Sequence, residues 1–198
     1  MTRSRRRQHC HAVVSAPTSN VERTVGSIMR VTTTRVVPLP PERAWSLLCD
    51  SRLQLRPLCP IFFLGTPRPH ECALPSGEGA VGAERECRSE QGTVHQRITV
   101  WEPPCRLRFH MESTSLGFGR YLDQLTDEFT LTPHPAGTVI SRTTTVRARG
   151  WLKPVRYAMV FVGLKSVHRF VFRNWQTSPP PPLRSGTSPT GPTNPSTR

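Results

Sequence analysis

Three stretches in the middle of the chain alternate between apolar and polar residues with a period of two. They cover residues 80–87, 94–100 and 105–111, and the turn signals Gln91-Gly92 and Pro103-Pro104 separate them. Such alternation is typical of β-strands with one buried and one wet face, and proline ends a strand because it has no amide hydrogen to donate. The pattern therefore predicts three antiparallel strands whose shared apolar face needs a cover.

Further elements are predicted on both sides of these strands. β-Branched residues favour a strand over residues 29–37. Pro40-Pro41-Glu42 starts a short helix, since proline is tolerated at the first helical position and an acid suits the positive helix end. The other predictions are a second short helix at 52–55, a loop at 67–79, and strands at 121–132 and 138–147. The apolar run CPIFFL at 59–64 fits either a buried strand or the lip of a cavity.

A long helix over residues 153–176 is the last predicted element. Apolar residues recur along it every three to four positions, as on the buried stripe of an amphipathic helix. Two lines of residues form this stripe: Val155, Met159 and Val162, and then Val160, Leu164, Val167 and Val171. We expect this helix to be the cover that the sheet needs.

The two ends of the chain lack any such periodicity. Residues 1–28 are polar and basic, and residues 177–198 hold seven of the 21 prolines. Segments of this composition bury too little apolar surface to fold. We therefore expect one folded domain at 29–176 between two disordered ends, with Met29 as an alternative start of the protein.

The chain carries a net charge of +14, which permits contact with nucleic acid or anionic lipid. No aromatic-basic platform or known nucleic-acid motif accompanies this charge, so nucleic acid is not an expected partner. No uncharged apolar run reaches the roughly 20 residues that a membrane span requires.

The six cysteines show no CxxC motif and no paired spacing, so we interpret them as small apolar residues in a reducing compartment. The cytoplasm is the expected location. Histidines and cysteines at 9–11 and 70–72 lack the second half of a zinc site, so no metal is expected. No cofactor is expected either, and the chain has no phosphate-cradling glycine loop that would support nucleotide binding.

The order of these elements, together with four segments, resembles the START-like helix-grip superfamily (SRPBCC), in particular its polyketide cyclase/dehydrase and lipid-transport branch. The segments are VVPLPPERAWSLL at 36–48, GAVGAER at 79–85, RITVWEPPCRLRF at 97–109 and FTLTPHPAGTVISRTTTV at 129–146. The resemblance spans about residues 29–176. It implies an α+β helix-grip fold, in which a curved seven-stranded antiparallel sheet wraps around a long C-terminal helix, with two short helices after strand 1. It also implies a pocket for an apolar or amphipathic small molecule, although one fold serves many chemistries.

Side chains in phase with the apolar residues of each strand are predicted to face the long helix. By that rule the wall includes Val81, Ala83, Ile98, Val100, Leu107, Phe109, Met111, Leu125, Phe129 and Ile140, with Phe62, Phe63, Met159 and Val162 as lid and helix contributions. Each of these residues fits a filled core as well as a ligand-binding wall. The resemblance favours a hollow.

Four charged residues share the inward phase: Arg85, Asp123, Asp127 and Arg142. A buried charge is costly unless it is paired. Asp127 and Arg142 are therefore candidates for a structural ion pair, for groups that orient a ligand or take part in catalysis, or for strand-end residues turned to solvent. His95 and His110 fall in the outward phase and are expected at the surface.

Two functions fit these observations. We favour a non-catalytic binder or carrier of a lipid-like or aromatic metabolite, because the inward set is overwhelmingly apolar. Docking of the basic surface and residues 61–64 on an anionic membrane is a variant of this function. The alternative is a cyclase/dehydratase-type enzyme, in which Asp123 is the base and Arg85, Arg142 or Tyr121 donates to an oxyanion.

Overall fold

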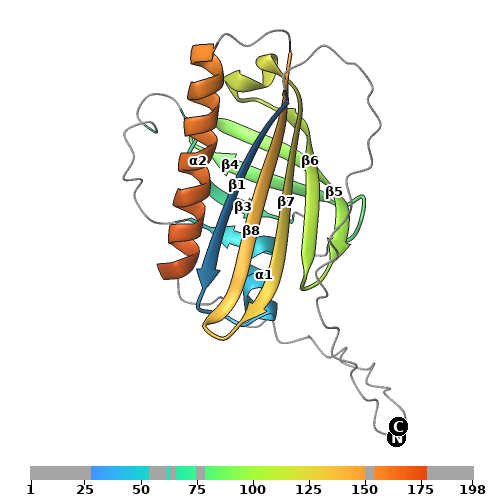
Figure 1. The fold of residues 1–198 in the computed structure, drawn as a ribbon. Coiled ribbons are helices and arrows are strands. Elements are labelled where there is room, and N and C mark those ends of the chain that lie inside the picture. Colours follow the sequence, from blue (N-terminus) through green and yellow to red (C-terminus); the bar gives the residue numbers. More distant parts are fainter. Residues whose placement is uncertain (1–27, 54–61, 63–65, 75–78, 150–153, 178–198) are drawn as a thin grey trace, which may run out of the picture.

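A computed structural model describes residues 28–53, 62, 66–74, 79–149 and 154–177. Figure 1 shows a bent sheet with one long helix alongside it. The elements are β1 (Ile28–Val37), α1 (Pro41–Cys49), β2 (Asp50–Arg52), β3 (Pro69–Ala73), β4 (Glu84–Ser89), β5 (Gly92–Glu102), β6 (Arg106–Thr114), η2 (Gly117–Tyr121), β7 (Leu122–His134), β8 (Gly137–Ala148) and α2 (Pro154–Thr177). Nearly all of the two ends predicted to be disordered, and Phe63, lie outside the described residues.

The strands form a single antiparallel sheet in the order β1-β8-β7-β6-β5-β4-β3-β2. The predicted fold class is confirmed, since a curved antiparallel sheet, a short helix after the first strand and a long C-terminal helix are all present. The strand count is eight rather than seven. The predicted loop at 67–79 contains β3. Of the second short helix predicted at 52–55, Arg52 is instead the last residue of β2, and residues 54–55 lie outside the described residues. Strands of three and five residues are too short to show alternation in the sequence.

The two helices meet the sheet in different ways. Helix α1 begins at Pro41 and buries an apolar face at Ala44, Trp45, Leu47 and Leu48. Helix α2 lies alongside the edge strand β1 (Figure 1), where the Lys165 ammonium and the Gln176 amide donate to main-chain carbonyls of β1. These contacts cover the free edge of the sheet, which would otherwise be open to pairing with another chain.

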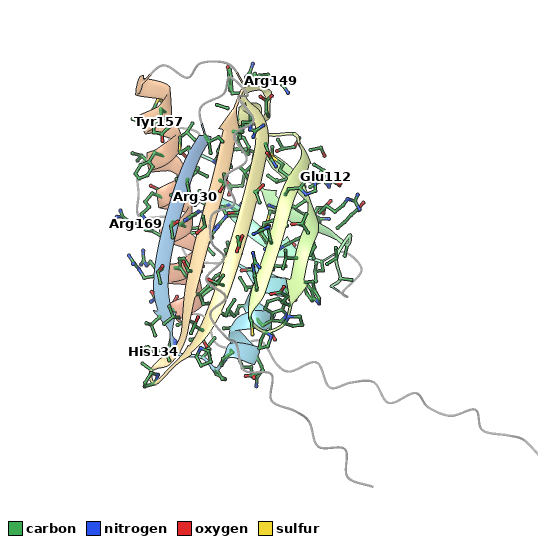
Figure 2. The ribbon with its side chains drawn as sticks, turned by 45° about the vertical axis from the view of Figure 1, so that its right-hand side comes forward. Arg30, Glu112, His134, Arg149, Tyr157 and Arg169 are labelled. Carbon is green, nitrogen blue, oxygen red and sulfur yellow. A yellow bond between two sulfur atoms is a disulfide. The ribbon has the colours of Figure 1, made fainter. Side chains whose placement is uncertain are left out.

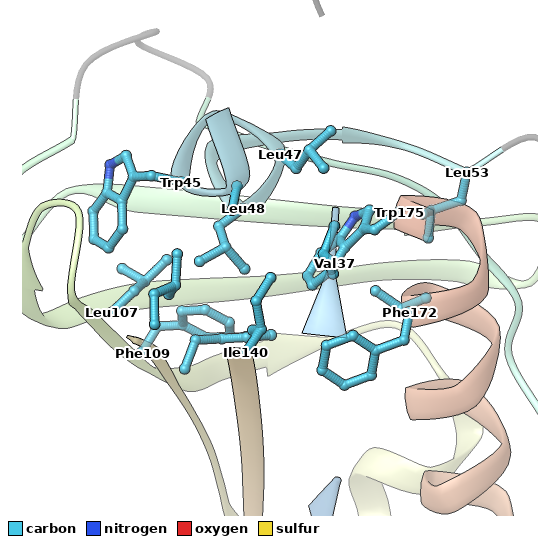
Figure 3. Close-up of a cluster of buried hydrophobic side chains, with 14 of the residues drawn as sticks. Val37, Trp45, Leu47, Leu48, Leu53, Leu107, Phe109, Ile140, Phe172 and Trp175 are labelled. Atoms are coloured by element: carbon cyan, nitrogen blue, oxygen red, sulfur yellow. The ribbon is translucent and has the colours of Figure 1, made fainter. Parts of the chain in front are cut away.

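Two apolar clusters fill the concave side of the sheet. The larger one lies between α1, the sheet and the second half of α2, and Figure 3 shows Phe172 and Trp175 of α2 close to Val37 of β1. The smaller one consists of Met29, Val31, Leu122, Leu125 and Val146, with Met111, Phe118, Val160 and Leu164 packed against it and only partly buried. Among the residues of α2 that meet these clusters, Val160 and Leu164 in the first half are only partly buried, whereas Phe170, Phe172 and Trp175 in the second half are buried.

Cys72 of β3 and Cys87 of β4 form a disulfide. The prediction that the cysteines are reduced apolar residues is therefore wrong for this pair. The two residues lie directly opposite each other on neighbouring strands, and their separation of 15 residues gave no recognisable spacing. Within the described part of the chain, no helix is long and apolar enough to cross a membrane.

Candidate functional site

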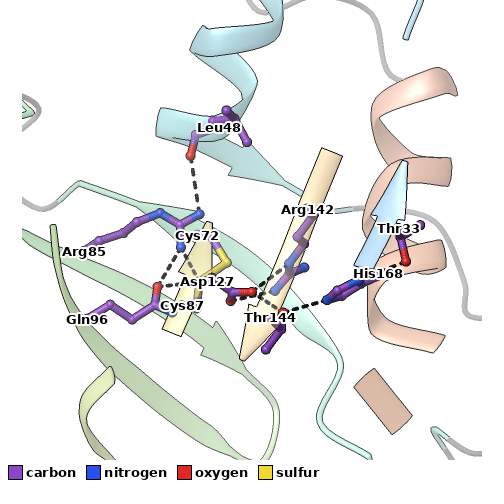
Figure 4. A network of polar contacts seen from close by, with 10 residues as sticks. All are labelled: Thr33, Leu48, Cys72, Arg85, Cys87, Gln96, Asp127, Arg142, Thr144 and His168. Carbon is purple, nitrogen blue, oxygen red and sulfur yellow. Dashed lines mark hydrogen bonds and ion pairs between the residues drawn. A yellow bond between two sulfur atoms is a disulfide. The ribbon is translucent and has the colours of Figure 1, made fainter. Parts of the chain in front are cut away.

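A row of polar side chains crosses the concave face of the sheet between the two apolar clusters (Figure 4). We call it the polar belt, and its members are Thr33, Arg85, Gln96, Asp127, Arg142, Thr144 and His168. Strand register brings them together, because Arg85 lies opposite Gln96 and Asp127 lies opposite Thr144 on neighbouring strands. His168 reaches the row from the middle of α2.

Asp127 and Arg142 form the ion pair that the sequence suggested. Arg142 Nε donates to Asp127 Oδ1 at 3.1 Å and Nη2 donates to Oδ2 at 2.9 Å, a two-pronged geometry that favours the charged forms. The Thr144 hydroxyl also donates to the Asp127 carboxylate. Burial on its own raises the pKa of Asp127, but the Arg142 charge and these hydrogen bonds hold the pKa below its ordinary value. Asp127 is therefore a weak base.

His168 joins the middle of α2 to two strands. Its Nε2 lies 2.7 Å from Thr144 Oγ1, and its Nδ1 lies 3.1 Å from Thr33 Oγ1. Because the Thr144 hydroxyl gives its proton to Asp127, its oxygen is left to accept from Nε2–H, so Nδ1 accepts from Thr33. Burial, with the nearby Arg142 charge, lowers the pKa of His168 to about 3. The imidazole is therefore neutral near pH 7.

Arg85 is the most deeply buried cation of the polar belt, with 5% of its surface exposed. Its guanidinium donates to Gln96 Oε1 at 2.7 Å, to the Leu48 carbonyl at 3.3 Å and to Cys87 Sγ at 3.0 Å, and it lies 4.5 Å from the centre of the Phe109 ring. All of these partners are neutral. Burial, together with the Arg142 charge, lowers the pKa of Arg85 to about 10, so the group still carries its charge near pH 7.

Most of the predicted wall residues do face the interior. Ile98, Leu107, Phe109, Leu125, Phe129, Ile140 and Phe62 are buried, and Met111 and Ala83 are partly buried against the clusters. These placements are compatible with a binding wall and with a filled core, so the binding role stays a prediction.

The inward direction predicted for Val100 is wrong because of a β-bulge. The register of β5 shifts between Ile98 and Val100, so Val100 pairs with the outward Arg108 and Trp101 pairs with the inward Leu107. One extra residue in a strand moves every later side chain to the other face. Trp101 accordingly packs on Trp45, with ring centres 5.0 Å apart.

A second bulge changes the position of Asp123. The register of β7 shifts between Leu122 and Gln124, so Asp123 is exposed and pairs with Arg149 at the surface, at 2.8 Å. Tyr121 is 45% exposed in η2. Of the four catalytic candidates, Arg85 and Arg142 belong to the polar belt, whereas Asp123 and Tyr121 do not.

Three more residues that were predicted to line the interior are exposed, two on the long helix and one before β4. Met159 and Val162 are 64% and 47% exposed, while Val160 and Leu164 face the sheet. Val81 lies in a turn before β4 and is 66% exposed. His95 is half exposed, as expected of a surface histidine, and His110 is partly buried.

Four members of the polar belt were missed: Thr33, Gln96, Thr144 and His168. Weak signals for them are present in the sequence. Gln96 is in phase with Ile98, Thr144 is in phase with Arg142, and His168 follows Leu164 by four residues, about one helical turn. A polar residue in the phase of a buried face is the signal that could have identified them.

Two hollows lined by described residues lie away from the polar belt. One, of about 420 Å³, is on the outer face of the sheet beside Arg30, Thr126 and Arg147, and the other, of about 480 Å³, is beside Leu53 and His70. Among the described residues, no group of three or more His, Cys, Asp or Glu side chains could hold a metal ion.

Comparison with known proteins decides the family. The family model described as "Polyketide cyclase / dehydrase and lipid transport" matches residues 29–177. The chain belongs to this family. Among curated proteins, none matches the sequence.

Solved structures similar to this member of the polyketide cyclase/dehydrase family include three from different sources. Ara h 8.0201 is 12% identical, with 77% of this chain and 100% of that chain covered, and a TM-score of 0.52. MLL2253 from Mesorhizobium loti is 18% identical, covering 73% and 95%, with a TM-score of 0.48. Ginseng major latex-like protein 151 from Panax ginseng is 10% identical, covering 73% and 95%, with a TM-score of 0.49. At such low identity, the likeness to Ara h 8.0201 supports the fold alone.

Proposed function

We propose that this protein binds a hydrophobic or amphipathic small molecule, such as a lipid-like or aromatic metabolite, between the sheet and the first half of α2. The observation that carries the proposal is that apolar residues at the first half of α2 are less buried than those at its second half. Next to the polar belt, Met111, Phe118, Val160 and Leu164 remain only partly buried, whereas the second half of α2 buries Phe172 and Trp175 almost completely. Small-molecule sites combine a mostly apolar lining with a few polar groups that fix orientation, and this end of the interior has both.

A carrier function is better supported than catalysis. A cyclase or dehydratase needs a base that faces the substrate, with a pKa suited to taking up a proton. Asp127 is already bound to Arg142 and Thr144, and its pKa is lowered. His168 is buried with both ring nitrogens hydrogen-bonded, and Asp123 is at the surface. None of these three groups is free to act as the base.

Binding of a neutral fluorescent probe, N-phenylnaphthylamine, tests the proposal directly. We expect saturable fluorescence enhancement that a long-chain alcohol reverses. Leu164→Gln places a polar group on the face of α2 that meets the sheet, and should weaken binding about tenfold. Met159→Gln is the matched control on the exposed face of the same helix and should bind like the parent protein. Absence of saturable binding, or equal binding by the Leu164→Gln variant, would refute the proposal.

We further propose that the ligand is exchanged at an anionic membrane. Tyr157, Met159, Phe161 and Val162 are exposed large apolar residues on the first half of α2. Residues 150–198 contain no acidic residue and seven basic ones: Lys153, Arg156, Lys165, Arg169, Arg173, Arg184 and Arg198. Apolar anchors beside basic residues are typical of helices that lie on anionic bilayers. Figure 2 shows Tyr157 and Arg169 on α2.

Co-sedimentation with phosphatidylcholine vesicles, with and without phosphatidylserine, tests the membrane contact. We expect binding to the vesicles that contain phosphatidylserine, and loss of that binding in high salt. Equal sedimentation with both vesicle types would argue against it. The cytoplasmic location stays a prediction, and the Cys72–Cys87 disulfide weighs against it, because disulfides are rare in reducing compartments.

A further inference from the structure

The polar belt holds one more positive charge than negative charge. Its ionised groups near pH 7 are Arg85, Arg142 and Asp127, since His168 is neutral. Asp127 makes its two-pronged contact with Arg142, and these two charges compensate each other. Arg85 is left with neutral partners among the described residues.

One hydrogen-bond donor of Arg85 is also unused. Its Nε is buried and has no hydrogen-bond partner in the described part of the chain. A buried donor without an acceptor costs free energy, and a buried cation without a counter-charge costs more. A bound anion would satisfy both the donor and the charge.

Arg85 lies between the two apolar clusters. Its guanidinium donates to the Leu48 carbonyl and lies over the Phe109 ring, on the side of the larger cluster. Its neighbour Gln96 pairs with Met111 across β5 and β6, and Met111 packs against the smaller apolar cluster. From the first half of α2 toward Arg85, the interior side chains therefore change from apolar ones to a cation. An elongated amphipathic molecule matches this arrangement, because its apolar tail can contact the apolar side chains while its charged head group meets the cation.

We propose that the ligand is an amphipathic carboxylic acid whose carboxylate binds at Arg85 and Gln96 while its apolar chain lies against Met111, Val160 and Leu164. This inference rests on the proposed function, because it assigns the chemical class of the molecule bound at the same site. A carboxylate fits better than a phosphate. Its single negative charge matches the single excess positive charge, whereas a doubly charged phosphate would also be repelled by Asp127.

Displacement of N-phenylnaphthylamine by matched amphiphiles near neutral pH tests the assignment. Tetradecanoic acid and tetradecanol share a chain length and differ in charge, and tetradecyl phosphate adds a second charge. We expect the acid to displace the probe at a concentration about tenfold lower than the alcohol does, and lower than the phosphate does. Equal potency of acid and alcohol would overturn the carboxylate assignment and leave the binding function standing. Greater potency of the phosphate would overturn the choice of carboxylate.

Two substitutions locate the head group. Arg85→Met keeps the length of the side chain and removes its charge, so the acid should lose its tenfold advantage while the alcohol binds as before. Arg85→Lys should restore part of the advantage. Arg97→Met is the control, because Arg97 is an arginine on β5 that pairs with Glu112 on the outer face.

An acid preference unchanged by Arg85→Met in a folded variant would refute the placement. If Arg85→Met does not fold, the wild-type comparison of acid and alcohol still tests the carboxylate assignment, and Arg85→Lys still tests the position of the head group. Failure of every amphiphile to displace the probe would instead refute the binding function itself.

Discussion

Acidification should destabilise this protein already in the mildly acidic range, and His168 should be the cause. The pKa of His168 is lowered from 6.5 to about 3 in the folded protein. Between these values the unfolded chain binds a proton that the folded chain does not, so unfolding becomes easier as the pH falls. The stabilisation is fully present above pH 6.5 and is lost progressively as the pH falls toward 3.

The size of this loss follows from the two pKa values. Each pH unit within the window costs about 1.4 kcal/mol per proton, so acidification from about pH 7.5 to about pH 4.5 should lower the free energy of unfolding by about 3 kcal/mol. Asp127 adds little to this loss. Its pKa is lowered from 3.8 in the folded protein, so its stabilisation is lost only as the pH falls below that ordinary value. The other charged groups that act on His168 are Arg142 and Lys165.

Urea unfolding followed by circular dichroism at a series of pH values measures the effect. The urea midpoint of the wild-type protein should fall by about 1 to 2 M across the window. His168→Gln keeps a donor and an acceptor for Thr144 and Thr33 but cannot titrate, so its free energy of unfolding should change much less with pH. His95→Gln, at a half-exposed position, should retain the wild-type slope. Equal pH dependence of the wild-type protein and His168→Gln would show that the buried imidazole is not the titrating group.

Three further predictions concern the fold. Gly137→Ala should destabilise by about 1 to 3 kcal/mol, because Gly137 has a φ of +128° and an added Cβ would lie 2.2 Å from the Val37 carbonyl oxygen. Gly82→Ala, with a φ of +89° and open space around it, should cost less in the same urea titration. Phe172→Ala should cost about 3 to 5 kcal/mol, since its ring is fully buried against Trp175. Hydrogen exchange should be faster in the first half of α2 than in the second, and equal rates would contradict the difference in burial between the two halves.

The fold was predictable because its elements are long and strongly patterned, whereas the directions of single side chains were not. In β7, Leu122 and Leu125 are both buried although their spacing of three does not fit a period of two. A bulge at Asp123 resolves the conflict, and an odd spacing of this kind is the trace that a bulge leaves in a sequence. In α2, the apolar run at 157–164 gives no phase, so Met159 and Val160 looked equivalent.

The polar belt was hidden for a different reason. His168 meets Thr33 and Thr144, which are 135 and 24 residues away in the sequence. No local pattern records which polar side chains from distant elements will meet in space. The pair of Asp127 and Arg142 could be suggested because both residues stand in the inward phase of two strands joined by a short hairpin.

The polar belt lies between the larger apolar cluster, which stabilises the fold, and the region under the first half of α2, where we propose that the ligand binds. On one side of it, α1 and the second half of α2 close over a filled apolar cluster. On the other side, the first half of α2 meets the smaller cluster through Val160 and Leu164, which are only partly buried. His168 hydrogen-bonds α2 to β8 and β1 at the boundary, and we expect a bound ligand to displace the first half of α2 rather than the second. The effects of substitution should divide in the same way. Phe172→Ala should lower stability with little change in probe affinity among the molecules that remain folded, and Leu164→Gln should lower affinity at a smaller cost in stability.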